Sequence, residues 1–384
     1  MNLIFELGIL FLICMAGEGI ATLLPIMIPA SVISLILLLI LLLLCGCAYA
    51  QEPEPETEVV TDGLSDEARE LLPTENAGTV DLWDGAKTVL TGALARAFGG
   101  WHEALRLCAL LLAVLTFCAL LQWQKEPPAA LVVVGALGIT GATVASMQSM
   151  VQLAAGTIEE LSAYGTCMLP VLASATAMSG GVSSSTALYG GAVLFSQLLT
   201  RAISKLLIPG VWLFLAVATA EAALGNQMLT ELRKLIGWLI SKGLKLFVGL
   251  FLAYLSLTGV ITASVDASAA KMTKAAVSGM VPVVGGMISD ASETLLASAG
   301  VLKNSVGVFG MLAVLAIALT PFLRVAAHYL LLRLTTAVGG AVALKPHVTL
   351  LEQLTTAMGF LLAMCAACCL LLLMATVCLM RVVV

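Results

Sequence analysis

The sequence predicts an all-α polytopic membrane protein, a helical bundle with roughly seven to nine membrane segments behind an N-terminal signal sequence or anchor. The chain has 384 residues, of which 60% are hydrophobic and only 11% are charged. Soluble domains carry about 25% charged residues. The apolar residues also fall into runs of about 20, the length of helix that crosses a bilayer. These observations exclude a soluble enzyme and leave little chain for a domain outside the membrane.

The first predicted unit, residues 1–50, is a signal sequence or an N-terminal membrane anchor. An almost pure Leu/Ile run is followed by an A-x-A site at Ala48 and Ala50, and polar sequence begins at Gln51. This pattern is typical of a cleavable signal peptide, so we expect cleavage before Gln51. An uncleaved anchor stays open because no basic residue precedes the apolar run, and lipidation of Cys47 is a third alternative. Each of these alternatives exports the chain that follows.

Residues 51–80 form an acidic linker that we expect to be disordered and extracytoplasmic. Its alternating Glu residues and its prolines give it too little apolar surface to fold alone. The rest of the chain has a mild basic excess but no basic patch with interleaved aromatic residues, so no nucleic-acid partner is expected. The acidic residues concentrated in and just after the linker are Glu52, Glu54, Glu56, Glu58, Asp62, Asp66, Glu67, Glu70, Glu75, Asp81 and Asp84.

Residues 81–106 have the apolar spacing of an amphipathic juxtamembrane helix, and residues 107–384 form the polytopic membrane domain. Some of its spans are apolar throughout. Others are rich in Gly, Ala, Ser and Thr, which lets helices approach closely, so we expect these to be buried among their neighbours. The clear spans are 107–123, 129–153, 206–223, 247–263, 306–323 and 358–379, and the weaker ones are 159–178, 184–200 and 325–344.

An interfacial helix is predicted within the membrane domain at residues 225–245. Apolar residues take one face of this helix, and charged residues take another. Short segments rich in Lys and Arg stay on the cytoplasmic side of a membrane, so this helix is the best cytoplasmic marker in the chain. Membrane-surface contact explains the pattern, and docking of a cytoplasmic partner is the alternative. The basic residues of this face are Arg233, Lys234, Lys242 and Lys245.

Residues 265–304 are predicted to form a re-entrant or surface loop, which is our main candidate functional element. Its apolar stretch is too short to span a bilayer, and a Pro and two adjacent glycines break any helix. Irregular backbone at membrane depth is tolerated only inside protein or beside a water-filled cavity. One interpretation is a helix cap at Ser289, and the other is a polar constriction or docking surface. The loop residues concerned are Pro282, Gly285, Gly286, Ser289, Asp290, Glu293, Lys303 and Asn304.

No feature of the sequence indicates an enzyme, a cofactor or a metal site. The histidines lack the HExxH or Cys/His spacing of metal sites, and no Walker-type phosphate loop occurs. The 10 cysteines lie almost wholly in apolar runs, where Cys acts as a small hydrophobic residue. Even Cys365, Cys368 and Cys369 are expected to pack a helix rather than to bind a metal.

Residues 282–294 contain a Pro-Val-Val-Gly and Ser-Asp-Ala run whose spacing is not generic to hydrophobic proteins, and three further stretches accompany it: Leu169-Pro170, Ser179-Gly180-Gly181 and residues 301–307. With them, the chain from about residue 80 to residue 384 resembles the stage III sporulation protein AE family. No catalytic residues are assigned to that family, so none carries over. The positions that match its motif are Pro282, Gly285, Ser289, Asp290, Lys303 and Asn304.

The resemblance implies a channel or scaffold subunit of the stage III mother cell-to-forespore transport complex, which is required for late forespore development. It implies a multi-pass protein of the mother-cell membrane around the forespore, with the bilayer, an ATPase and ring-forming subunits as partners. A homo-oligomer is a further expectation. Two rival interpretations remain, an autonomous secondary transporter with broken helices and a holin-like membrane protein. The second depends on residues 7–44, which resemble the start of the CidA/LrgA holin-like family.

Overall fold

The computed structural model describes residues 66–70, 82–99, 101–121, 129–179, 182–280, 285–341 and 344–380. The expected signal sequence with its cleavage site, and most of the acidic linker, lie outside these residues, as do the side chains at 259–303. Every regular element in the described part of the chain is a helix. The predicted all-α class is therefore confirmed.

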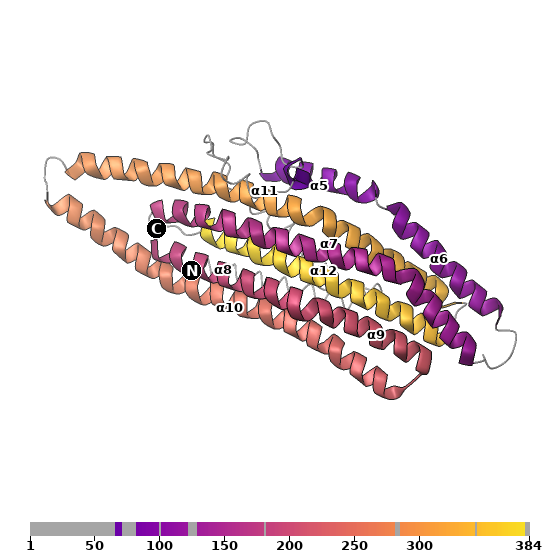
Figure 1. The fold of residues 1–384 in the computed structure, drawn as a ribbon. Coiled ribbons are helices and arrows are strands. Elements are labelled where there is room, and N and C mark those ends of the chain that lie inside the picture. The colour runs from indigo at the N-terminus through magenta and orange to yellow at the C-terminus, as the bar shows by residue number, and fades with distance from the viewer. Residues whose placement is uncertain are drawn as a thin grey trace.

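The long helices lie side by side in an elongated bundle with α12 (Lys345–Met380) at its centre (Figure 1). α12 packs against α7 (Ala129–Met178), α8 (Val182–Ala202), α9 (Ile208–Leu224) and α11 (Gly285–Gly339). Nearly every residue in its second half is buried. The most apolar sequence in the chain therefore lies where neighbouring helices cover it on all sides.

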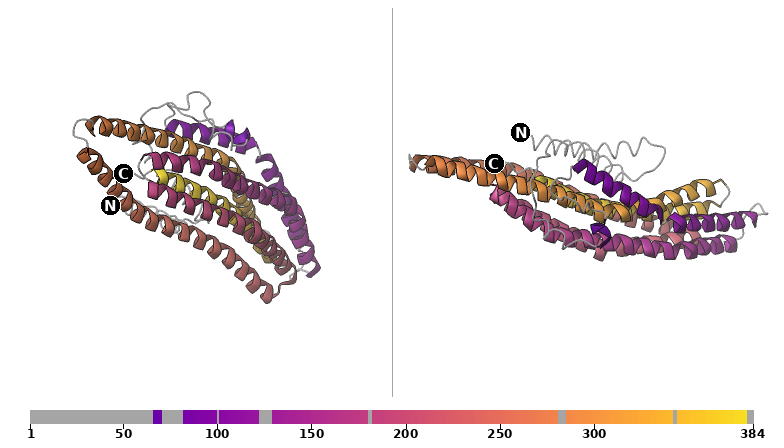
Figure 2. Two further views of the ribbon diagram at one scale, coloured as in Figure 1. Left: turned by 60° about the vertical axis from the view of Figure 1, so that its left-hand side comes forward. Right: turned by 90° about the horizontal axis from the view of Figure 1, so that it is seen from above.

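The remaining helices cover the outside of this core. α10 (Gln227–Met280) packs along α8 and α9. α5 (Leu82–Gly99) and the short α4 (Asp66–Arg69) lie on α11, and α6 (Trp101–Leu120) contacts both α11 and α7. The two further views in Figure 2 show the same elongated arrangement, with α10 at one edge of the bundle and α6 at the other.

Six helical stretches in the described residues are long and apolar enough to cross a membrane. Together with the all-helical fold, they confirm the predicted polytopic membrane bundle, and the chain is a multi-pass membrane protein by length and composition. The stretches are Trp101–Leu120, Ala130–Met178, Ser185–Leu224, Gln227–Leu255, Asn304–Gly339 and Lys345–Met380.

Several of these helices are longer than the spans that the sequence predicts. α7 has 50 residues and merges the expected spans 129–153 and 159–178. At about 1.5 Å per residue, it is about 75 Å long, more than twice the thickness of a bilayer core. Glu159 and Glu160 interrupt its apolar pattern, but Glu is a good helix former, so the charge does not end the helix. In α11, Arg324 likewise falls inside one helix that merges 306–323 with most of 325–344.

The segment expected as a separate interfacial helix is the beginning of α10, which continues to Met280 for 54 residues. A tight turn precedes it, in which Gly225 has φ 64° and its N–H donates to the Glu221 carbonyl. A positive φ is accessible to glycine without steric cost, so this residue allows α9 and α10 to fold back on each other.

Candidate functional site

The predicted loop 265–304 is almost entirely helical. α10 runs through to Met280, and α11 begins at Gly285. Only residues 281–284 separate the two helices, and Pro282 falls among these undescribed residues. The far ends of α10 and α11 extend beyond the ends of the neighbouring helices as a hairpin (Figure 1). The interval between the two helices is therefore much shorter than the predicted loop 265–304.

The remaining loop residues lie on the first turns of α11. Because the helix begins at Gly285, Ser289 is inside it rather than at its cap, which does not fit the capping interpretation. The side chains of the acidic and basic residues in this stretch lie outside the described part. The residues placed on α11 are Gly285, Gly286, Ser289, Asp290, Glu293, Lys303 and Asn304.

Arg233, one of the four residues of the expected basic face, lies inside the bundle. Its Nε donates to Glu221 Oε2 over 2.5 Å, and its Nη1 donates to Gln353 Oε1 over 2.8 Å. Thr230 Oγ1 donates to the other oxygen of the same carboxylate. The two charged side chains are only 12% and 14% exposed. The ion pair joins α9 to α10, the hydrogen bond to Gln353 adds α12, and Arg233 is unavailable to a surface partner.

Lys234, a second residue of the expected basic face, forms its own ion pair at the surface. It is exposed and pairs with Glu231 one turn earlier on α10, over 2.8 Å. Lys242 and Lys245 are exposed about two and three turns further along α10. The four residues predicted as one face therefore divide into a buried ion pair, an exposed ion pair and two surface lysines.

Two further exposed basic residues lie near the junction of α8 and α9. Arg201 lies in the last turn of α8, and Lys205 lies in the π-helical segment η1 (Ile203–Leu207) that links α8 to α9. Both side chains are exposed.

Two contacts fix the register of α10 against α8 and α9. The rings of Phe195 on α8 and Phe251 on α10 lie 5.4 Å apart between centroids. A β-carbon at Gly210 would lie 3.5 Å from Ile240 Cδ1. Because α10 runs antiparallel to α8 and α9, the segments between these two contacts lie opposite each other. Arg201 and Lys205 were not among the residues predicted from the sequence, although the Arg201-x-x-x-Lys205 spacing after a long uncharged stretch was a signal that could have identified them.

Several buried polar atoms have no hydrogen-bond partner among the described residues. Glu160 Oε1 and Tyr164 Oη lie one turn apart on α7, and Thr320 Oγ1 and Arg324 Nε lie one turn apart on α11. α7 and α11 pack directly against each other. Unpaired polar groups are costly inside a membrane bundle and mark candidate paths for water or ions.

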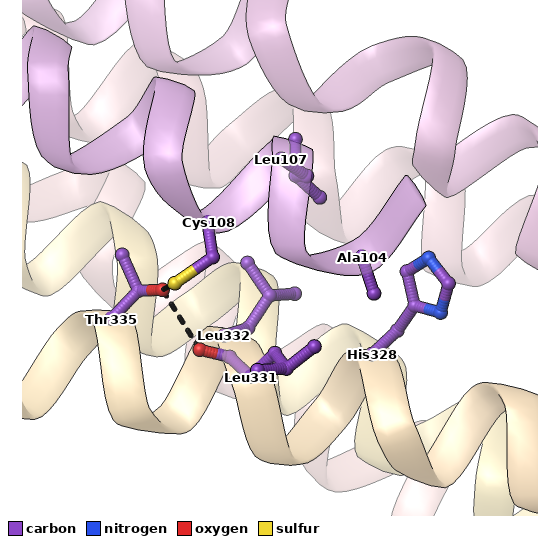
Figure 3. A pocket seen from close by; sticks show the side chains of 7 residues that line it. All are labelled: Ala104, Leu107, Cys108, His328, Leu331, Leu332 and Thr335. Atoms are coloured by element: carbon purple, nitrogen blue, oxygen red, sulfur yellow. Dashed lines mark hydrogen bonds between the residues drawn. The ribbon is translucent and has the colours of Figure 1, made fainter. Parts of the chain in front are cut away.

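A small pocket lies between α6 and α11 (Figure 3). Thr335 Oγ1 donates to the Leu331 carbonyl over 2.8 Å and lies 2.7 Å from Cys108 Sγ. Since the Thr hydrogen is engaged, the Cys108 thiol is the donor to Thr335. His328 faces Ala104, and its Nδ1 lies 3.0 Å from the Arg324 carbonyl. Contacts as short as these are typical of closely packed helices, here α6 and α11.

The described residues contain no group of three or more His, Cys, Asp or Glu side chains that could hold a metal ion. Cys365, Cys368 and Cys369 are buried on α12 without disulfide bonds. Cys365 Sγ lies 4.0 Å from the carbonyl of Ala154 on α7. These cysteines fill the contact between the central helix and its neighbours.

Comparison with known proteins identifies one family. The sequence model of the family described as stage III sporulation protein AE matches residues 86–382. The chain is also similar to the stage III sporulation protein AE of Bacillus subtilis (strain 168), with 22% identity over 218 residues. This match covers 57% of the chain and 55% of the relative, so it spans about half the length of each. No solved structure matches the chain.

Proposed function

The chain belongs to the stage III sporulation protein AE family, and from this premise we propose that it is a channel or scaffold subunit of the stage III mother cell-to-forespore transport complex. The observation that carries the proposal is the family match, which extends over residues 86–382 and so includes nearly the whole helical bundle. The multi-pass fold is compatible with a place in the mother-cell membrane around the forespore.

The packing of the bundle favours a structural or shared-channel role over a pore within a single chain. The centre of the bundle is filled by α12, and large side chains such as Tyr164, Phe214 and Phe251 are fully buried around it. Interiors packed in this way leave few voids larger than a water molecule. A conduit would therefore run between this chain and other subunits, which include an ATPase and ring-forming proteins in our proposal.

Affinity purification from cells in mid-sporulation tests this function. A tagged chain, extracted in mild detergent, is expected to recover the ATPase and ring subunits of the same complex, as identified by quantitative mass spectrometry. A tagged unrelated multi-pass protein of the same membrane is the control. Recovery of the chain alone, stable and monodisperse, would contradict the proposal.

A second candidate function, an autonomous secondary transporter, is favoured by the unpaired polar atoms on α7 and α11. Glu160 is an ionisable residue inside a candidate membrane span, and such residues commonly lie on ion or substrate paths. Glu160→Gln keeps the size of the side chain and removes its charge. If the purified chain, reconstituted alone in vesicles, catalyses proton-coupled or ion-coupled uptake that Glu160→Gln abolishes, this second function replaces the first.

A further inference from the structure

Glu160 on α7 and Arg324 on α11 carry opposite charges, and each has a buried atom without a partner. Glu160 Oε1 and Arg324 Nε make no hydrogen bond to any described residue. Thr320, one turn before Arg324, is only 5% exposed, and its Oγ1 is equally unpaired. All three residues lie in candidate membrane spans. Buried polar groups are costly unless they are hydrogen-bonded, so each of these atoms is expected to bind a partner.

α7 and α11 run in opposite directions. α12 is parallel to α7 and antiparallel to α11, as contacts along its length show. These contacts are Cys365 with Ala154 and Leu379 with Thr176 for α7, and Val348 with Gly340 and Met380 with Gly307 for α11.

The register of the antiparallel pair brings the three residues to similar heights. Met168 of α7 packs against Gly310 of α11. Counted from this contact, Glu160 is within about 3 Å of the level of Thr320 and about 9 Å from that of Arg324, at about 1.5 Å per residue. Thr320 therefore lies between the levels of the two charged residues.

On α7, Glu160 faces away from the central helix α12. At about 100° per residue, Glu160 lies about 80° around the helix from Met168. This rotation leads away from Gly165, which packs against Leu372 of α12. Glu160 therefore lies on the α11 side of α7, opposite α12.

On α11, Thr320 and Arg324 face away from α12 as well. They lie about 80° and 40° around the helix from Gly310, which contacts α7. This rotation leads away from Gly307, which packs against Met380 of α12. All three residues therefore face the groove between α7 and α11 that lies opposite α12.

The direction of the side chains closes the remaining distance. Side chains of an α-helix lean toward its N-terminus. Because the helices are antiparallel, Glu160 leans toward the level of Arg324, and Arg324 leans toward that of Glu160. Pro321 adds an acceptor nearby, because it has no N–H to donate to the carbonyl of Ile317.

We propose that water bound in this groove joins Glu160, Thr320 and Arg324. The water donates to Glu160 Oε1, accepts from the Arg324 Nε–H and shares a hydrogen bond with the Thr320 hydroxyl. Buried water commonly makes about three hydrogen bonds to groups that would otherwise be unpaired, and these three atoms provide them. The two charges become a water-mediated ion pair that ties α7 to α11 inside the membrane. This link does not depend on either function proposed above.

The charges of the site favour water over an ion. A cation bound to Glu160 would be repelled by Arg324, and an anion bound to Arg324 would be repelled by Glu160. Water has no net charge, and it provides both a donor for the carboxylate and an acceptor for the guanidinium.

Solid-state NMR of the full-length chain in lipid bilayers tests for the water. In protein with isotope-labelled arginine, the Nε–H signal of Arg324 is identified by its loss in Arg324→Lys. This signal is expected to receive magnetisation from water several times faster than that of Arg233. Arg233 is the matched control because its Nε donates directly to Glu221. Arg201, which is exposed, gives the signal of a hydrated guanidinium.

Thermal unfolding in detergent tests the link between the helices. Thr320→Val keeps the shape of the side chain and is expected to lower the melting temperature, whereas removal of an unbound hydroxyl would raise it. Glu160→Gln and Arg324→Met should each lower the melting temperature, and the double variant should fall little below the lower of the two. Glu159→Gln, which removes the adjacent exposed acid, is the matched control and should change nothing. Tyr164 lies ten residues from the level of Arg324 and is outside the site.

Four results would overturn the proposal. The Arg324 signal could receive magnetisation from water no faster than the Arg233 signal, or Thr320→Val could raise the melting temperature. Coupling of Glu160 to Arg324 without a water signal would indicate a direct ion pair. Sodium or chloride could stabilise the wild-type chain relative to choline gluconate, with the effect lost in Glu160→Gln or Arg324→Met, which would assign the site to an ion. If a charge variant is not monodisperse, the NMR comparison and Thr320→Val decide.

Discussion

The ring of Tyr254 on α10 occupies the space that a side chain at Gly191 on α8 would need. A β-carbon built at Gly191 would overlap the Tyr254 ring, and Tyr254 Oη donates to the Ala187 carbonyl over 2.7 Å. Phe195 packs against the same ring, with 5.6 Å between centroids. This contact fixes the register of α8 against α10.

Gly191→Ala is therefore expected to destabilise the bundle. The new methyl group must displace the Tyr254 ring or the helix backbone, and overpacking of this kind costs about 1–3 kcal/mol. The matched control is Gly190→Ala, because a β-carbon at Gly190 has no neighbouring atom within 4 Å. Thermal unfolding in detergent measures the difference. Equal melting temperatures for the two variants would show that α8 and α10 do not pack in this way.

Removing the charge of Arg233 should be far more harmful than removing that of its neighbour. Arg233→Met leaves the largely buried Glu221 carboxylate unpaired, which costs about 3–5 kcal/mol. Lys234→Met breaks only an exposed ion pair, which contributes less than about 1 kcal/mol. The double variant Glu221→Gln with Arg233→Met should recover much of the loss. Additive losses in that cycle, measured by thermal unfolding, would contradict a direct ion pair.

Two tyrosines should respond in opposite ways to loss of their hydroxyl groups. Tyr254→Phe removes the hydrogen bond to Ala187 and is expected to cost about 1 kcal/mol. Tyr164→Phe removes a buried hydroxyl that has no partner among the described residues, so stability should be unchanged or should rise. A marked loss for Tyr164→Phe would mean that water or another molecule binds this hydroxyl. Denaturation of both variants in the same detergent measures the difference.

The first turns of α11 remain the predicted functional element. Asp290→Ala with Glu293→Ala is expected to impair sporulation after engulfment without lowering the amount of protein, because charges beside a membrane are costly unless they are used. Spore yield and an immunoblot of the membrane fraction measure the two quantities. Glu231→Ala, which removes an exposed acid elsewhere, serves as the control. Normal spore yield in the double variant would rule out a role for these carboxylates.

The sequence was sufficient to predict the all-α membrane bundle because hydrophobic run length is a local property. The predicted loop over 265–304 was too long, because α10 continues to Met280 and α11 begins at Gly285. The sequence could not predict that α7 and α11 are continuous past Glu160 and Arg324. A charge interrupts an apolar pattern without ending a helix, so run length alone divides one long helix into two spans.

The tertiary structure decided which basic residues are buried and which are exposed. Arg233 and Lys234 are neighbours in the sequence, but about 100° of helical rotation separates their side chains. The fold of α9 onto α10 turns one of them toward Glu221 and leaves the other exposed. Composition and periodicity thus determined that the chain lies in a membrane, whereas helix register, set by contacts such as that of Gly191 with Tyr254, determined where its charges meet.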